Sequence, residues 1–313
     1  MKRVFAILLV FAAILALAAC GGSGEKLTFT TGGETGTYYG FGTVLAGQIS
    51  EDTDTTVTAI VGAGSKGNIE AMDEGDAQMG LVQSDVMAYA YAGTNLFESK
   101  YEGFSTVAAL YMEQVQIVTL DPNIKTVADL KGKNVSVGAS GSGVYFNAID
   151  VLNAYDLTLD DINPTYQSFG DSTEALQDGK IDAGFIVSGA PTTAITSLAT
   201  SRDVYLVELD DAHIEKLTAA SPYYSKNVIP AEAYGLEEDA TTVAVGAVII
   251  ARDDVDEDAV YNVVSGIFES VDTLAHDKKA ELDLDFAASV TAVPYHKGAA
   301  KYFAEKGITV PTK

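Results

Sequence analysis

Runs of apolar and β-branched residues alternate along the chain with stretches in which apolar residues recur every three or four positions. The first pattern is typical of buried strands, and the second of helices packed on a sheet. Strands are predicted at 27–31, 55–61, 78–82, 107–111, 114–120, 134–139, 164–167, 183–187, 204–209 and 241–251. Helices are predicted at 38–50, 68–74, 85–92, 126–130, 144–155, 172–177, 191–199, 257–276 and 298–306. The alternation predicts an α/β fold with largely parallel sheets.

Individual residues support these elements. Phe41, Leu45 and Ile49 are four residues apart and therefore share one face of the helix predicted over 38–50. Pro191 is expected in the first turn of the helix predicted over 191–199, where its missing N–H is harmless.

Two turn-rich segments, at 121–123 and 226–239, are candidate crossovers between two lobes. We therefore expect lobe 1 to be discontinuous, formed by 27–117 with 241–313. Lobe 2 is expected to consist of 118–240.

The first 26 residues have the pattern of an export leader. Lys2 and Arg3 precede an apolar run over 4–16, which is shorter than the ~20 residues of a spanning helix, and small residues lead to Cys20. The pattern predicts a lipoprotein signal peptide at 1–19 and a tether at 20–26 carrying lipid on Cys20. The alternative is a plain secretory signal. In both cases the mature protein is expected outside the cytoplasm, and the lipid would anchor it to the cell membrane.

Composition narrows the function. The net charge of −25 argues against nucleic acid and anionic membrane surfaces as partners, although a local site can still bind an anion. A single Cys excludes an internal disulfide. The three His residues lack metal-ligand spacing, and no G-x-S-x-G elbow is present. We therefore expect no metal, no cofactor and no enzyme activity.

Four times a β-rich run ends in a loop of Gly, Ser and Thr that opens a helix. The four segments begin at Leu27, Thr55, Asn134 and Ile181. A helix N-terminus carries roughly half a positive charge and unpaired N–H donors. Several such ends around one crevice would bind a small acid without Arg. We expect loops one and two in lobe 1, and loops three and four in lobe 2.

The second loop, Gly62 to Gly67, also reads G-x-G-x-x-G, and Asp85 follows near the end of the next strand. This spacing resembles the dinucleotide-binding fingerprint. However, the helix predicted after the loop is short for that fold, and nicotinamide cofactors are scarce outside the cytoplasm. We favour a smaller anion bound by Ser65 and helix N–H groups. Lys66 is either a ligand contact or a solvated charge.

The candidate ligand-binding residues lie in these loops and beside the strand end at Gln83. Of the neighbouring Tyr38 and Tyr39, one is expected to face the ligand and the other to pack against the protein. The full set is Thr31, Gly32, Thr37, Tyr38, Tyr39, Ser65, Asn68, Gln83, Ser84, Ser140, Ser142, Gly143, Gly189, Ala190 and Pro191.

Several segments, in a shared order, resemble one family of extracytoplasmic receptors, the TAXI-type solute-binding proteins of TRAP transporters. They are 31–39, 64–68, 83–85, 88–93, 129–133, 141–143, 176–183, 188–191 and 296–307. The resemblance implies a two-lobed periplasmic-binding-protein-like (type II) fold that closes on a ligand between its lobes. It also implies glutamate, glutamine or a dicarboxylate as ligand, and membrane permease subunits as partner. Glu34 departs from the small residue usual at its position, and this disfavours a strongly anionic ligand.

Two other functions fit the same sequence. A binding protein could report its closed state to a signalling receptor, and a neighbouring permease gene would separate this from transport. An extracytoplasmic enzyme is the other alternative, which measurable turnover of a bound ligand would support.

Overall fold

The computed structural model describes residues 24–313. The predicted signal peptide and Cys20 lie outside this range. None of the helices between residues 24 and 313 is long and apolar enough to cross a membrane.

One mixed sheet runs through the described part of the chain, in the order β2-β1-β3-β10-β4-β7-β5-β6, with β8 on β4 and β9 on β10. Its strands are β1 Lys26–Thr30, β2 Thr56–Ile60, β3 Met79–Gln83, β4 Phe104–Thr119, β5 Asn134–Ser136, β6 Asn163–Thr165, β7 Ala183–Ser188, β8 Tyr205–Leu206, β9 Ser225–Ile229 and β10 Ala240–Arg252. β1 pairs in parallel with β2 and β3, and β5 with β6 and β7. β4 and β10 pair antiparallel with their neighbours. The prediction of largely parallel strands therefore holds for only part of the sheet, because β4 and β10 pair antiparallel.

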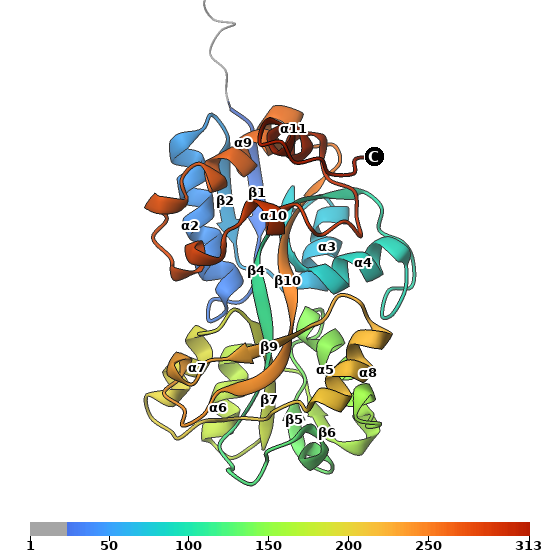
Figure 1. Cartoon of the computed structure of the whole chain (residues 1–313), viewed down its shortest axis with the longest axis vertical. Helices are drawn as coiled ribbons and strands as arrows, with labels where there is room; N and C mark the ends of the chain where they lie inside the picture. Colours follow the sequence, from blue (N-terminus) through green and yellow to red (C-terminus); the bar gives the residue numbers. More distant parts are fainter. Residues whose placement is uncertain (1–23) are drawn as a thin grey trace, which may run out of the picture.

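Helices cover the sheet on both faces (Figure 1). They are α2 Thr37–Asp52, α3 Ser65–Asp73, α4 Ser84–Ala92, α5 Gly143–Ala154, α6 Phe169–Gln177, α7 Thr193–Ala199, α8 Asp211–Ala220, α9 Glu257–Phe268, α10 Leu284–Ala287 and α11 Lys297–Glu305. Short 3₁₀ turns occupy Val127–Leu130, Leu159–Asp161, Ala231–Ala233, Val271–Thr273 and Asp277–Glu281.

The elements form an upper and a lower lobe joined by β4 and β10 (Figure 1). One half of β10 pairs with β3 of the upper lobe and the other half with β9 of the lower lobe. β4 pairs with β10 along most of its length and reaches β7 of the lower lobe at its end. The expected lobe boundaries, at 118 and 240, lie within these two strands.

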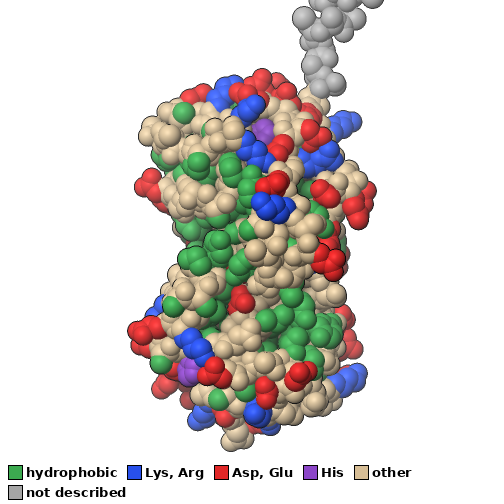
Figure 2. Space-filling model, turned by 90° about the vertical axis from the view of Figure 1, so that its right-hand side faces the viewer, with side chains coloured by type: hydrophobic (Ala, Val, Ile, Leu, Met, Phe, Trp, Pro, Cys, Tyr) green, Lys and Arg blue, Asp and Glu red, His purple; other side chains and the backbone are tan. Residues whose placement is uncertain are grey.

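Each lobe has its own buried cluster. In the upper lobe, Phe41, Leu45 and Ile49 of α2 are fully buried, as their four-residue spacing predicts. In the lower lobe, Val151 of α5 packs in a cluster with Phe185 of β7. Between the lobes the surface narrows, and hydrophobic side chains outnumber charged ones at this waist (Figure 2).

The structure corrects several predicted elements. The strands predicted at 107–111 and 114–120 are one strand, β4, because Glu113 is buried within the ladder and does not end it. The helix predicted over 257–276 ends at Phe268, and the polar segment that follows forms a 3₁₀ turn.

Three helices or strands were missed, and one proline was misplaced. α8 begins at Asp211, after the N-cap Asp210, whose side chain accepts the His213 backbone N–H. β9 and the short helix α10 lie in segments for which no strand or helix was predicted. Pro191 lies before the N-cap Thr192 of α7, so it is not in the first helical turn.

Candidate functional site

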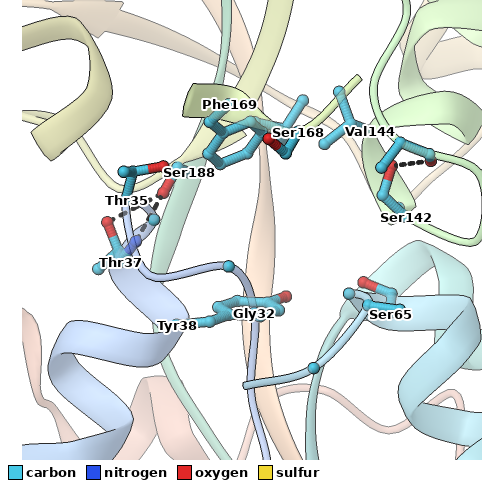
Figure 3. Close-up of a pocket in the computed structure, with 18 of the residues that line it drawn as sticks. Gly32, Thr35, Thr37, Tyr38, Ser65, Ser142, Val144, Ser168, Phe169 and Ser188 are labelled. Atoms are coloured by element: carbon cyan, nitrogen blue, oxygen red, sulfur yellow. Dashed lines mark hydrogen bonds between the residues drawn. The ribbon is translucent and has the colours of Figure 1, made fainter. Parts of the chain in front are cut away.

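A cavity of about 310 Å³ lies where the two lobes meet. The upper lobe contributes the loops before α2 and α3, and the lower lobe contributes the loops before α5 and α6 and the end of β7. Figure 3 shows Gly32, Tyr38 and Ser65 on one side, facing Ser142 and Phe169 on the other. The cavity is thus formed by both lobes together, as in a cleft that has closed.

Four helices begin at the cavity wall. The N-caps of α2, α3 and α5 are Gly36, Gly64 and Ser142, and none of these three residues makes a side-chain capping hydrogen bond to its own helix. Only α6 is capped from its own N-cap, because Ser168 accepts the Asp171 backbone N–H. The first turns of three helices are therefore suited to an anionic group of a ligand.

Glycine is required at one of these N-caps. Gly64 has φ of +92°, and a Cβ there would lie 3.2 Å from the α-carbon of Ser142 in the opposite lobe. The Gly67 backbone N–H donates to the Gly141 carbonyl across the same gap, at 3.0 Å. The second and third loops thus meet backbone to backbone.

The floor of the cavity carries a buried carboxyl group. Glu113 lies on β4 and is 1% exposed. The Tyr38 hydroxyl donates to Glu113 Oε2 at 3.3 Å. Burial raises the pKa of Glu113 to about 8, although Gln83 and Tyr38 favour its ionised form. Burial and the nearby Glu113 carboxyl raise the pKa of Tyr38 well above its usual value, so Tyr38 acts as a neutral donor.

Gln83 connects the floor to the lower lobe. Its Nε2 donates to Asn147 Oδ1 at 2.9 Å, and its backbone N–H donates to Ser65 Oγ at 3.0 Å. Asn147 in turn donates to Asp85 Oδ2 at 2.9 Å and to the Tyr224 hydroxyl at 2.7 Å. This buried set of polar groups joins the lobes next to the cavity.

A second set of contacts joins the lobes on the other side. The Thr37 backbone N–H donates to Ser188 Oγ at 3.2 Å, and its hydroxyl donates to the Gly189 carbonyl at 3.2 Å. The Ala194 backbone N–H donates to the Thr35 carbonyl at 3.2 Å. These bonds hold the two lobes together in the arrangement that the structure shows.

The charged side chains that line the cavity are all acidic. Glu34 and Asp171 are exposed at its mouth, and Glu113 is buried at its floor. Among the described lining residues there is no Lys, Arg or His. Residues 24–313 also contain no group of three or more His, Cys, Asp or Glu placed to hold a metal ion.

Seven of the candidate residues line the cavity: Gly32, Thr37, Tyr38, Ser65, Gln83, Ser142 and Gly143. Others lie just behind it. Thr31 donates to the Ile60 carbonyl, Asn68 donates to the carbonyls of Thr31 and Leu81, and Ser84 Oγ accepts the Gly246 N–H. Their side chains brace the loops and are not among the lining groups.

The remaining candidates are outside the lining. Tyr39 is half-buried beside Tyr38 on α2, and Ser140 is exposed. Gly189 and Ala190 present carbonyls to Thr37 and Lys278, and Pro191 follows them. Asp85, the acid expected in a dinucleotide site, is buried, accepts a bond from Asn147 and does not line the cavity.

Three lining groups were missed by sequence reasoning. Glu113 is the only acidic residue in the long, mostly apolar β4, and a lone acid there signals a buried, functional charge. Ser188 ends the strand before the fourth loop. Ser168 and Phe169 belong to a further segment, 167–171, where α6 begins and which lacks the Gly-rich signature of the other four loops.

The architecture is that of the periplasmic binding proteins. The chain is similar to the alkanesulfonate-binding protein SsuA from Xanthomonas axonopodis pv. citri (TM-score 0.53, 16% identity, 91% of this chain and 85% of that chain covered). It is similar to MatC from Rhodopseudomonas palustris with bound malate (TM-score 0.56, 13% identity, 82% of this chain and 86% of that chain covered). It is also similar to a periplasmic binding protein of high arginine specificity from Salmonella typhimurium (TM-score 0.50, 14% identity, 82% of this chain and 96% of that chain covered). At these identities the likeness establishes the fold.

The sequence comparison gives the family. Residues 29–307 match the NMT1-like family. This range contains both lobes and every loop that lines the cavity. The chain belongs to the NMT1-like family.

Proposed function

We propose that this protein is the solute-binding component of a membrane transporter. It captures a small polar organic acid or amino acid between its lobes and delivers it to a permease. The observation that carries the proposal is the cavity of about 310 Å³, which both lobes line and on which three helix N-termini converge. Its volume suits a metabolite-sized ligand.

The proposed mechanism is hinge closure. A ligand that touches the loops of both lobes makes all its contacts only in the closed state, so binding shifts the population toward closure. The hydrogen bonds of Thr37 to Ser188 and Gly189 add to the closed state. A permease can then distinguish loaded from empty protein by shape.

The finer assignment rests on the resemblance of the sequence. We propose that the permease is of the TRAP type, that the protein is a TAXI-type receptor, and that lipid on Cys20 anchors it outside the cytoplasm. The similar structures, solved with or named for a sulfonate, malate and arginine, support a small polar ligand without selecting one. Glutamate, glutamine and dicarboxylates form the starting panel.

The direct test is mass spectrometry of the protein purified under non-denaturing conditions, without refolding. We expect a small molecule at close to one per chain, recovered chemically unchanged, and restabilisation of the stripped protein when it is added back. A ligand converted to product during incubation would indicate an enzyme. No retained ligand, together with no thermal shift from any member of the panel, would contradict the proposal.

The lining residues give a second test. Tyr38→Ala and Ser142→Ala should remain folded and bind the recovered ligand at least about tenfold more weakly, as expected for loss of one or two contacts. Ser140→Ala, in the same loop as Ser142 but exposed and outside the lining, is the matched control. Parental affinity in both lining variants would place the ligand elsewhere.

A further inference from the structure

The floor of the cavity contains acceptor atoms that the protein does not satisfy. Glu113 Oε1 and Gln83 Oε1 are buried, and neither has a hydrogen-bond partner among residues 24–313. The two side chains are 1% and 2% exposed, and both line the cavity. Leaving a buried acceptor without a donor is unfavourable, so a ligand that brings donors to this point removes that cost.

Two donors close to Glu113 are already used. Tyr38 has one hydroxyl hydrogen, which goes to Glu113 Oε2. The nearest cation, Lys278, is buried above the Tyr111 ring, donates to the Ala190 carbonyl at 2.9 Å and pairs with Glu281. Lys278 does not line the cavity. The floor therefore lacks a positive group of its own.

Three helix starts adjoin this floor. Tyr38 of α2 donates to Glu113, Ser65 Oγ of α3 accepts the Gln83 backbone N–H, and Gly143 of α5 lies against Gln83 Oε1. Each of these helices has at least nine residues, and their first turns line the cavity. The cavity is thus polarised, with an acceptor floor and donor walls. Glu113 lies at the crossing of the lobes, paired with Val245 of β10, so closure does not move it away from the ligand.

We infer that the ligand is a zwitterion, with its ammonium group bound by the Glu113 and Gln83 side-chain oxygens and its carboxylate at the helix N-termini. This inference rests on the proposed function and narrows its ligand class to amino acids. A dicarboxylate of the same size would set one carboxylate against Glu113, with no lining cation to separate them. Glu113 is on this view the residue that determines specificity.

The two ligand classes differ in their response to pH. Closure over a dicarboxylate requires a protonated Glu113, so its affinity should fall as the pH rises from 6 to 9. An ammonium group instead binds ionised Glu113, so amino-acid affinity should rise as the pH rises from 6 to 8. The other titratable groups near Glu113 are Tyr38 on α2, Asp85 on α4, Tyr111 on β4, and Lys278 and Glu281 in the 3₁₀ turn Asp277–Glu281.

The test compares two variants by calorimetric titration with glutamate, glutamine, alanine, the N-acetyl form of each, succinate and malate. Glu113→Gln should bind the preferred amino acid at least about tenfold more weakly and succinate more tightly, because the charge at the floor is removed. Glu51→Gln, an exposed acid on α2, should change neither. Opposite shifts for two ligands cannot come from a misfolded protein.

The outcomes separate the inference from the function. N-acetylation should abolish binding of the preferred amino acid. Succinate or malate binding more tightly than every amino acid, or Glu113→Gln binding the amino acid as the parent does, would overturn the zwitterion while leaving a solute-binding protein. Failure of all these compounds, with no ligand retained in native purification, would overturn both.

Discussion

Gly143, the first residue of α5, has no space for a side chain. A Cβ at this position would lie 1.8 Å from Gln83 Oε1 and 2.7 Å from Ser65 Oγ, both on the upper lobe. The three atoms nearest to this Cβ position all belong to the upper lobe. The restriction therefore concerns the closed arrangement of the lobes and not the folding of either one.

Gly143→Ala should consequently weaken ligand binding by more than about tenfold while leaving each lobe folded, since one methyl group blocks closure and an alanine is favourable in a helix. Calorimetry with the natively retained ligand gives the affinity, and urea denaturation gives the stability. Gly47→Ala, at an exposed position of α2 where a Cβ meets nothing within 4 Å, is the control and should bind normally. Equal affinities for the two variants would contradict the close contact.

At the scale of elements, capping explains where several helices begin. Asp256 Oδ1 accepts the backbone N–H groups of Asp258 and Ala259 at 2.9 and 3.2 Å, and so fixes the start of α9. α9 packs with its fully buried Val260, Val263 and Ile267 in the upper-lobe cluster. It contributes no residue to the cavity.

Asp256→Ala should therefore lower the free energy of unfolding by about 1 kcal/mol and the Tm by about 2–4 °C, without changing ligand affinity. Asp256→Asn keeps a capping oxygen and should stay close to the parent. Thermal unfolding monitored by circular dichroism measures both. A change in ligand affinity in Asp256→Ala would show that α9 is coupled to the cavity.

Local patterns predict much of this structure, and long-range pairing explains the rest. The four-residue spacing of Phe41, Leu45 and Ile49 predicts α2. The Gly-rich loops predict where helices begin around the cavity. Judged from local sequence, the polar Glu113 ends a strand. In the structure β4 continues past Glu113 because it pairs with β10 there. Segment 167–171 is brought to the cavity by the packing of the lower lobe, which no local motif encodes.

At the scale of the whole molecule, closure buries acids. Asp85 is fully buried, and burial raises its pKa to about 7; the Asp150 carboxyl acts in the same direction. Asn147, which belongs to the opposite lobe, donates to Asp85 Oδ2. When the lobes separate, Asp85 becomes more hydrated and its pKa falls toward the ordinary value of 3.8.

Closure of the ligand-free protein should therefore take up protons. Between about pH 4 and pH 7 the closed state binds more protons than the open state, so lowering the pH from 8 to 5.5 should favour the closed form. Small-angle scattering should report a smaller radius of gyration at pH 5.5. Asp85→Asn should reduce this change, and a radius independent of pH in the parent would contradict the coupling.

The two long strands that join the lobes have a further consequence for engineering. β4 enters the lower lobe and β10 leaves it side by side, with Gln114 opposite Ala244, so the segment between them begins and ends at nearly the same point. Such a segment has the geometry of an insertion, which can be exchanged between relatives without moving its attachment points. A circularly permuted fluorescent protein placed at that junction would convert lobe movement into light, and would make the protein a reporter for its own solute.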